Sequence, residues 1–309
     1  MAQTNSPGDK IFRAILVAAA AFILVIVAAM IGVMLEYSMP TISRFGLGFL
    51  TGLEWNPAMD RYGALPFIYG TVVSSLIALV IAVPISLGIA IFLTEQADAR
   101  LARPVAFLVE LLAAIPSVVY GLWGIFVLAP FVREYLGHFL QTYLGFIPLF
   151  QGRLTGIGML TGGLILAIMI TPIITAVIRE VLEAVPAAQR EAALALGATK
   201  WETTQIVLAN AASGIAGAVV LGLGRALGET MAVTMVIGNT PQISASLLEP
   251  AYTIASVLAS NFADATGEIY LSALIEIGLI LFLVTFVVNA IAKLLVAGVA
   301  GRQGRAAGH

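Results

Sequence analysis

The 309-residue sequence has no cysteine and only two histidines, His138 and the C-terminal His309. The absence of cysteine excludes disulfides and thiolate metal sites, and two histidines so far apart do not suggest a metal site, so we expect no metal. Charge is scarce as well, because only 10% of the residues are charged, whereas a soluble domain has about 25%. The formal net charge of −2 gives no basic excess that would point to nucleic acid.

Hydrophobic residues make up 60% of the chain, and the mean hydropathy is +1.03. A water-soluble core cannot absorb that much apolar surface, but helices that satisfy their own backbone hydrogen bonds can place it in lipid. Runs that can cross a hydrocarbon core about 30 Å thick predict six transmembrane helices in an all-α, polytopic membrane protein. These runs are 11–35, 67–93, 105–131, 156–178, 213–237 and 271–296. The first exceeds the roughly 7 to 15 apolar residues of a signal peptide, so we expect a retained helix.

Basic residues are unevenly divided between the two sides that this topology defines. Six spans put both termini on one side, and ten Lys and Arg fall there against four on the other. The positive-inside rule predicts that both termini are cytoplasmic, in a bacterial-type plasma (inner) membrane. The ten are Lys10, Arg13, Arg100, Arg103, Arg179, Arg190, Lys200, Lys293, Arg302 and Arg305, and the four are Arg44, Arg61, Arg133 and Arg153.

Residues 179–212, between the fourth and fifth spans, are too many for a turn and have a helical composition before and after Gly197. Pro186 can begin a helix, and Gly197 can adopt the left-handed conformation that ends one. We expect a short helix, a glycine break and a second helix leading into the membrane. From composition alone, the short helix could also be an amphipathic helix at the lipid surface.

Glu191, Ala192 and Ala193, followed after three residues by Gly197, resemble the EAA-x3-G signature of importer-type ABC permeases. The resemblance implies that 179–212 is a cytoplasmic coupling segment whose short helix docks in a groove of an ATPase. Small residues permit close approach, and Gly197 allows the turn that presents the helix. The family's continuation, Ile-x-Leu-Pro, reads Val-Leu-Ala-Asn at 207–210, so its last two positions depart from the family.

The fifth predicted span contains Arg225 and Glu229, four residues apart and therefore on one helix face. Intramembrane charges are costly to bury and are functional-site candidates by default, although an ion pair could simply hold two helices together. As a site, the planar guanidinium of Arg225 would bind two oxygens of an oxyanion such as phosphate. Glu229 would neutralise Arg225 in the anion's absence, and its competition for the guanidinium would allow release.

Three further stretches, 62–71, 114–124 and 225–233, resemble the membrane subunits of phosphate ABC importers. Together with the EAALALGAT segment, they follow the family's order from about residue 62 to residue 240. Tyr-Gly-Leu-Trp-Gly at 120–124 and Trp-Asn-Pro at 55–57 favour one of the family's two paralogous permease subunits over its sister.

The resemblance implies the transmembrane domain of a type I ABC importer, and Arg225 and Glu229 would then matter for phosphate passage. The chain would be a non-catalytic permease subunit. Its partners would be a PstA-like permease subunit in a heterodimer, a PstB-like ATPase dimer, a PstS-like phosphate-binding protein and membrane lipid. We divide the chain into an N-terminal transmembrane helix with the first periplasmic loop (1–66), a permease core that includes 179–212 (67–297), and a cytoplasmic tail (298–309).

The sequence contains no Walker A pattern, G-x-x-x-x-G-K-[ST], so ATP would be bound by a partner and we expect no cofactor on this chain. A permease for another oxyanion, molybdate or sulfate, remains the main alternative. A secondary ion-coupled transporter usually has internal repeats, which are not evident here, and an intramembrane enzyme needs clustered catalytic groups, which these spans lack. We interpret Glu95 and Asp98 as a solvated cytoplasmic turn, and Glu276 as structural rather than as part of a polar cavity.

Overall fold

The computed structural model describes residues 7–306, and this part of the chain is α-helical. Within it, six helical segments are long and apolar enough to cross a membrane, which confirms the predicted all-α, six-span membrane protein. These segments are Gly8–Phe45, Leu65–Gln96, Ser117–Leu144, Met159–Glu183, Lys200–Leu227 and Glu268–Leu294.

Five long helices form the frame of the molecule: α1 (Pro7–Phe45), α3 (Leu65–Ile91), α8 (Met159–Glu183), α10 (Lys200–Leu227) and α13 (Glu268–Ala306). The third span is segmented, since α5 (Ser117–Trp123), α6 (Ala129–Phe131) and α7 (Gly137–Leu144) are joined by π-helical turns. The shorter helices are α2 (Gly48–Thr51), α4 (Ala99–Ala113), α9 (Ala187–Ala195), α11 (Met231–Val236) and α12 (Ile254–Asn261).

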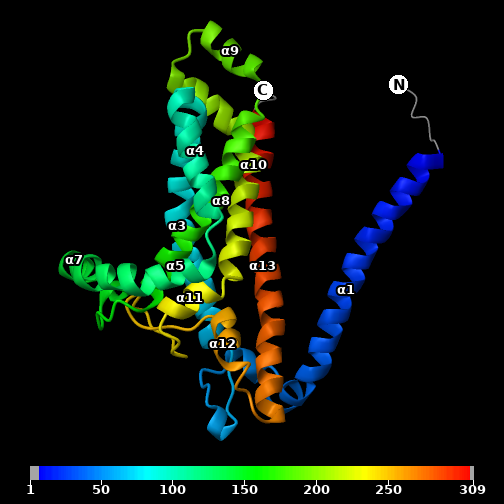
Figure 1. Ribbon diagram of the computed structural model, residues 1–309, viewed down its shortest axis with the longest axis vertical. Coiled ribbons are helices and arrows are strands. Elements are labelled where there is room, and N and C mark those ends of the chain that lie inside the picture. Colours follow the sequence, from blue (N-terminus) through cyan, green and yellow to red (C-terminus); the bar gives the residue numbers. More distant parts are fainter. Residues whose placement is uncertain (1–6, 307–309) are drawn as a thin grey trace.

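The helices α3, α8 and α10 pack side by side, with α4 against α8 and α13 against α10 (Figure 1). The helix α9 lies at one end of this bundle, here called the α9 end, and α12 lies towards the opposite, α12 end. The start of α1 and the end of α13 both lie towards the α9 end, as an even number of spans requires. Residues 307–309 of the predicted tail lie outside the described residues.

The core is centred on α8, whose apolar window is the most buried of the six spans. Ile165, Ile170, Ile174 and Ile178 are fully buried along it. Glycines let the neighbouring helices approach closely: a Cβ added at Gly222 of α10 would lie 2.5 Å from Cδ1 of Ile174. Small residues at helix contacts are typical of membrane bundles, where association depends on close packing.

Two predicted spans have wrong boundaries. The third, placed at 105–131, begins instead at Ser117, because α4 ends at Ala113 and Pro116 lacks a backbone N–H and restricts the residue before it. The fifth, placed at 213–237, begins at Lys200 and its helix ends at Leu227, so that α11 forms a separate short helix. Hydropathy does not mark the first break, because the residues around Pro116 are mostly apolar. Arg225 and Glu229 lie at the second break, but averaging over the apolar residues on both sides hides them.

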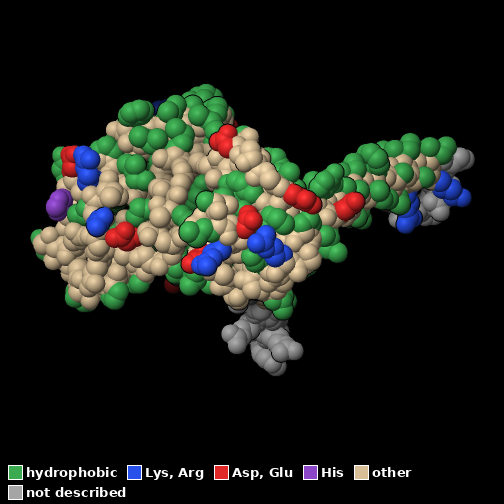
Figure 2. Space-filling view, turned by 90° about the horizontal axis from the view of Figure 1, so that it is seen from below, with side chains coloured by type: hydrophobic (Ala, Val, Ile, Leu, Met, Phe, Trp, Pro, Cys, Tyr) green, Lys and Arg blue, Asp and Glu red, His purple; other side chains and the backbone are tan. Residues whose placement is uncertain are grey.

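The first helix diverges from the bundle (Figure 1). It is attached near its end, where the Thr41 hydroxyl donates to Oγ of Ser272 on α13 at 2.6 Å. Most of its apolar side chains between Ile11 and Leu35 are exposed, and Figure 2 shows the resulting hydrophobic surface on the projecting helix. In a membrane this surface contacts lipid or another chain.

Candidate functional site

Arg225 and Glu229 lie together, but they do not share a helix as the sequence predicted. Arg225 is in the last turn of α10, which ends at Leu227, and Glu229 follows in the break before α11. Nη2 of Arg225 is 3.4 Å from Oε2 of Glu229. The predicted pairing is therefore present, while the predicted common helix face is wrong because the helix stops at Gly228.

The two members of this pair differ in burial. The side chain of Glu229 is 4% exposed, and its second oxygen, Oε1, accepts from the backbone N–H of Ala232 in the first turn of α11 at 3.3 Å. The side chain of Arg225 is 49% exposed. The carboxylate is thus fixed in the protein by two contacts, whereas the guanidinium has open space beside it for another anion.

Arg225 belongs to a stripe on the uncovered side of α10. Ser213, Gly217, Leu221 and Arg225 are all exposed and recur every fourth residue, which places them on one helix face. The buried side of α10 packs on α8 through Gly214 and other small residues. The bundle therefore leaves one face of α10 exposed, with the guanidinium of Arg225 near its end.

The segment 179–212 has the predicted order of a short helix, a glycine break and a second helix. The helix α9 is followed by Gly197 in the left-handed region, with φ of +87°. Thr199 then begins α10 with a capping box: its hydroxyl accepts from the N–H of Glu202 at 3.3 Å, and its N–H donates to Oε2 of Glu202 at 2.7 Å. The two helices are set at an angle by a turn that only glycine adopts without strain.

The EAA-x3-G residues divide between two environments. Glu191, Ala192 and Gly197 are exposed, whereas Ala193 is buried. Exposed apolar side chains surround them. Leu196 is 90% exposed, and Leu194 and Trp201 are each about half exposed. The α9 end thus presents small and apolar residues on a protruding helix, a surface suited to docking in a groove.

Sequence reasoning missed a buried ion pair at the same end. The carboxylate of Glu95, in the π-helical turn Phe92–Gln96 that follows α3, is 8% exposed and lies 2.8 Å from Nη2 of Arg190 on α9. The interpretation of Glu95 as part of a solvated turn is therefore wrong. The two residues are 95 positions apart and no pattern in the sequence connects them, so only the fold brings them together.

Glu276 lies on α13, 7% exposed, and its Oε2 has no hydrogen-bond partner within the described part of the protein. It borders a cavity of about 630 Å³ between α1 and α13 whose other lining residues are apolar. Because these lining residues are apolar, the site favours a structural role for Glu276 over a place in a polar transport cavity.

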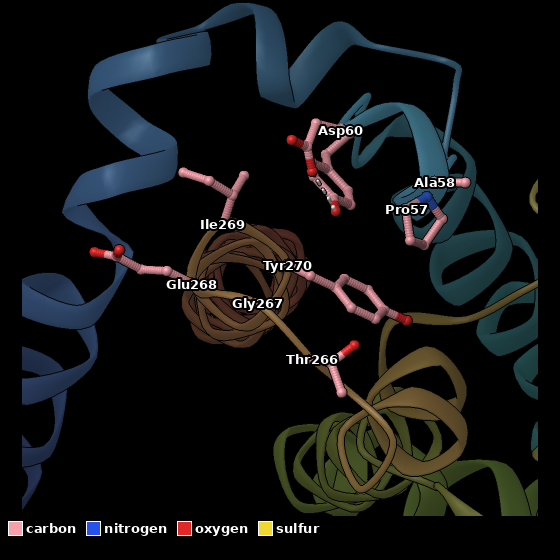
Figure 3. Close-up of a pocket in the computed structure, with 9 residues that line it drawn as sticks. Pro57, Ala58, Asp60, Thr266, Gly267, Glu268, Ile269 and Tyr270 are labelled. Atoms are coloured by element: carbon pink, nitrogen blue, oxygen red, sulfur yellow. Dashed lines mark hydrogen bonds between the residues drawn. The ribbon is translucent and has the colours of Figure 1, made fainter.

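A hollow of about 390 Å³ opens at the α12 end, between the loop before α3 and the start of α13 (Figure 3). Burial, reinforced by the neighbouring Asp60, raises the pKa of Tyr62 to about 12, and the phenol donates to Oδ1 of Asp60 at 3.4 Å. The Tyr62 ring stacks on Tyr270 with centroids 5.9 Å apart, and Trp55 lies edge-on to Tyr62 at 5.0 Å. These three rings pack against one another at the α12 end.

Comparison with known proteins gives this geometry a context. A family model described as "Binding-protein-dependent transport system inner membrane component" matches residues 82–301. Among solved structures, an inward-facing MetNI methionine ABC transporter has 19% sequence identity and a TM-score of 0.49, covering 77% of this chain and 94% of that one.

Several curated relatives carry the name "Phosphate transport system permease protein PstC". The protein from Xylella fastidiosa (strain 9a5c) is 46% identical, covering 98% of this chain and 97% of the relative. Those from Mesorhizobium japonicum and Pasteurella multocida are each 47% identical, covering 96% and 93% of this chain and 92% and 91% of the relative. The chain therefore belongs to the family of binding-protein-dependent inner-membrane transport components and, within it, to the PstC permeases.

Proposed function

We propose that this chain is a membrane-spanning permease subunit of an ATP-driven phosphate importer and forms part of the path by which phosphate crosses the bilayer. The observation that carries the proposal is the half-exposed guanidinium of Arg225 beside the buried, doubly held carboxylate of Glu229. The names of the relatives supply the substrate, phosphate.

The exposure of Arg225 supports a place on the translocation path. A guanidinium is costly to leave in the hydrocarbon core, so the part of the open α10 face that carries Arg225 must meet water, the membrane interface or another protein surface. A second permease subunit of the PstA-like kind would supply that surface. The path then runs between the two subunits, along the stripe from Ser213 to Arg225.

The pair provides both binding and release. Phosphate accepts two N–H groups of the planar guanidinium, an arrangement that a single ammonium cannot offer. Glu229 loses its contact with Arg225 during this step but keeps the backbone N–H of Ala232. Because the carboxylate stays close to Arg225, it competes with bound phosphate for the guanidinium and so promotes the release of phosphate.

In this proposal, a partner subunit supplies the energy for transport by hydrolysing ATP. A PstB-like ATPase dimer binds and hydrolyses ATP, so this subunit is non-catalytic and needs no cofactor of its own. The groove of the ATPase receives α9 through the exposed Glu191 and Ala192 and the turn at Gly197, while the buried Ala193 packs α9 against the rest of this chain. The protrusion of α9, its exposed Leu194 and the exposed Leu196 that follows it support this role.

The proposed orientation follows from the docking of α9 on the ATPase, which is cytoplasmic. The α9 end, both termini, the coupling segment 179–212 and the tail 298–309 lie in the cytoplasm, and the α12 end faces the periplasm. The region 1–66 then supplies the first helix and first periplasmic loop, and 67–297 the permease core. The aromatic hollow at Tyr62 and Tyr270 lies on the face where a PstS-like phosphate-binding protein would dock.

ATP-dependent uptake of labelled phosphate into proteoliposomes tests the proposal. The vesicles contain this chain with its candidate permease partner, ATPase and binding protein, and sulfate and molybdate serve as competitors. We expect uptake that disappears when this chain is omitted and that neither competitor reduces. Uptake of sulfate or molybdate in place of phosphate would agree with an importer but contradict phosphate as its substrate. Substrate-driven flux through this chain alone would contradict an ATP-driven importer.

A further inference from the structure

The helix α9 is held to the bundle mainly through one side chain. Arg190 contacts the Glu95 carboxylate with two guanidinium nitrogens: Nη2 lies 2.8 Å from Oε1, and Nε lies 3.3 Å from Oε1 and 3.4 Å from Oε2. Ala193 is the one buried residue of α9, and its methyl group makes only a small contact with the bundle. The position of α9 therefore depends strongly on the charged contact.

The same guanidinium also binds the end of α8. Nη1 donates to the carbonyl of Val185 at 2.7 Å, and Nη2 donates to the carbonyl of Leu182 at 2.9 Å. Carbonyls at a helix C-terminus lack partners within the helix and carry the negative end of its dipole, so they favour a cation. Arg190 thus binds one carbonyl in the last turn of α8 and one just beyond its end, while it holds the carboxylate of Glu95 in the turn after α3.

Glu95 connects this contact to α3. It lies in the π-helical turn that directly continues α3, and α3 and α8 pack along each other in the centre of the bundle. One guanidinium on α9 is therefore bonded to the ends of both central helices. A displacement of α9 moves the ends of α3 and α8 together.

We infer that Glu95 and Arg190 are positioning residues that transmit the displacement of α9 to α3 and α8 during transport. The inference rests on the proposed function, because it assumes that a nucleotide-driven partner moves α9. The burial of Glu95 makes the link stiff, since a buried carboxylate that loses its cation is left without compensation. Arg190 in turn cannot leave Glu95 without also releasing two helix-end carbonyls.

A second ion pair at this end offers a matched control. Nη2 of Arg179 on α8 lies 3.0 Å from Oε1 of Glu110 on α4, and the Glu110 side chain is 54% exposed. This pair joins two helices of the bundle but does not touch α9. A Glu110→Gln change therefore removes a more exposed interhelical ion pair of similar length without removing the proposed link.

The first arm of the test measures amide hydrogen exchange of α9 in the complete complex in lipid nanodiscs. Glu95→Gln keeps the shape of the side chain and removes its charge, and we expect it to raise the exchange of the α9 amides by about tenfold or more, whereas Glu110→Gln leaves them unchanged. Arg190→Lys keeps the charge but cannot span the carboxylate and both carbonyls, so it gives an intermediate rise. Unchanged exchange in Glu95→Gln would overturn the inference, whatever the substrate.

The second arm measures the ATP hydrolysed per phosphate imported. A change that merely reduces the amount of folded complex lowers both rates and leaves their ratio constant. We expect Glu95→Gln and Arg190→Lys to raise the ratio at least about fivefold, within the usual range of coupling between sites. A constant ratio in both would contradict the inference. If the wild-type complex imports no phosphate, the proposed function fails, and the exchange of α9 still decides whether Glu95 holds this helix.

Discussion

Nη2 of Arg225 lies 3.4 Å from the carboxylate of Glu229, although the helix that carries Arg225 ends two residues after it. The carboxylate is buried and bonded to α11, and the guanidinium is half exposed. Because of this difference in burial, Arg225 is the residue that exchanges partners, and Glu229 is the residue that stays in place. The functional predictions for the path depend on that division.

Glu229→Gln should slow transport without disturbing α11. The amide oxygen of glutamine still accepts from the N–H of Ala232, but the charge that competes with phosphate for Arg225 is lost. We expect the maximal uptake rate to fall about tenfold, corresponding to about 1.4 kcal/mol of added retention. Initial rates at saturating phosphate in proteoliposomes measure this. Glu134→Gln, in the exposed pair with Arg133, is the control, and an equal maximal rate in Glu229→Gln and control would exclude the competition.

Ala192→Trp should uncouple hydrolysis from transport. Ala192 is exposed on α9, so the indole does not disturb the core of this chain, but it blocks close approach to a groove. We expect this chain to fold and to pair with its permease partner normally, but the loaded binding protein no longer stimulates the ATPase, whereas Ala192→Ser behaves as wild type. Full stimulation in Ala192→Trp would remove Ala192 from the docking surface.

Gly197→Val should act through the turn rather than the surface. Its φ of +87° is in the left-handed region, where a side chain costs about 1–2 kcal/mol and a branched one more. Open space surrounds the position, so strain and not collision decides the outcome. We expect α9 to reorient and stimulated ATPase activity to fall. Stimulation equal to that of the wild type would show that the turn tolerates a side chain.

Tyr62 should remain a neutral phenol at unusually high pH. Burial, with Asp60 beside it, raises its pKa from 10.0 to about 12, so the neutral form is the one that the fold stabilises. The contribution of this residue to stability is complete below pH 10 and is lost as the pH rises through about 12. The tyrosinate absorbance of the wild type minus that of Tyr62→Phe measures the titration. A midpoint near 10 would contradict the environment described for Tyr62.

The sequence was sufficient for the broad architecture because long apolar runs and the scarcity of charge leave few alternatives to a helical membrane bundle. It was also sufficient for the glycine break at Gly197, since few other residues adopt that turn. It did not locate the helix ends near Pro116 and Gly228, because long apolar stretches on both sides of each residue suggest one continuous span. The Glu95–Arg190 pair could not be predicted, because residues so distant in sequence meet only through tertiary packing.

Phosphate uptake by an Arg225→Gln complex tests the central claim most directly. Arg225 is half exposed, and Glu229 keeps the hydrogen bond from the backbone N–H of Ala232, so the complex should still assemble and co-purify with its ATPase. Loss of two charge-assisted hydrogen bonds, each worth about 1.5–3 kcal/mol, predicts at least about a hundredfold loss of uptake. Arg133→Gln, in an exposed pair away from α10, should transport as the wild type does. Unaltered phosphate uptake by an assembled Arg225→Gln complex would contradict the account.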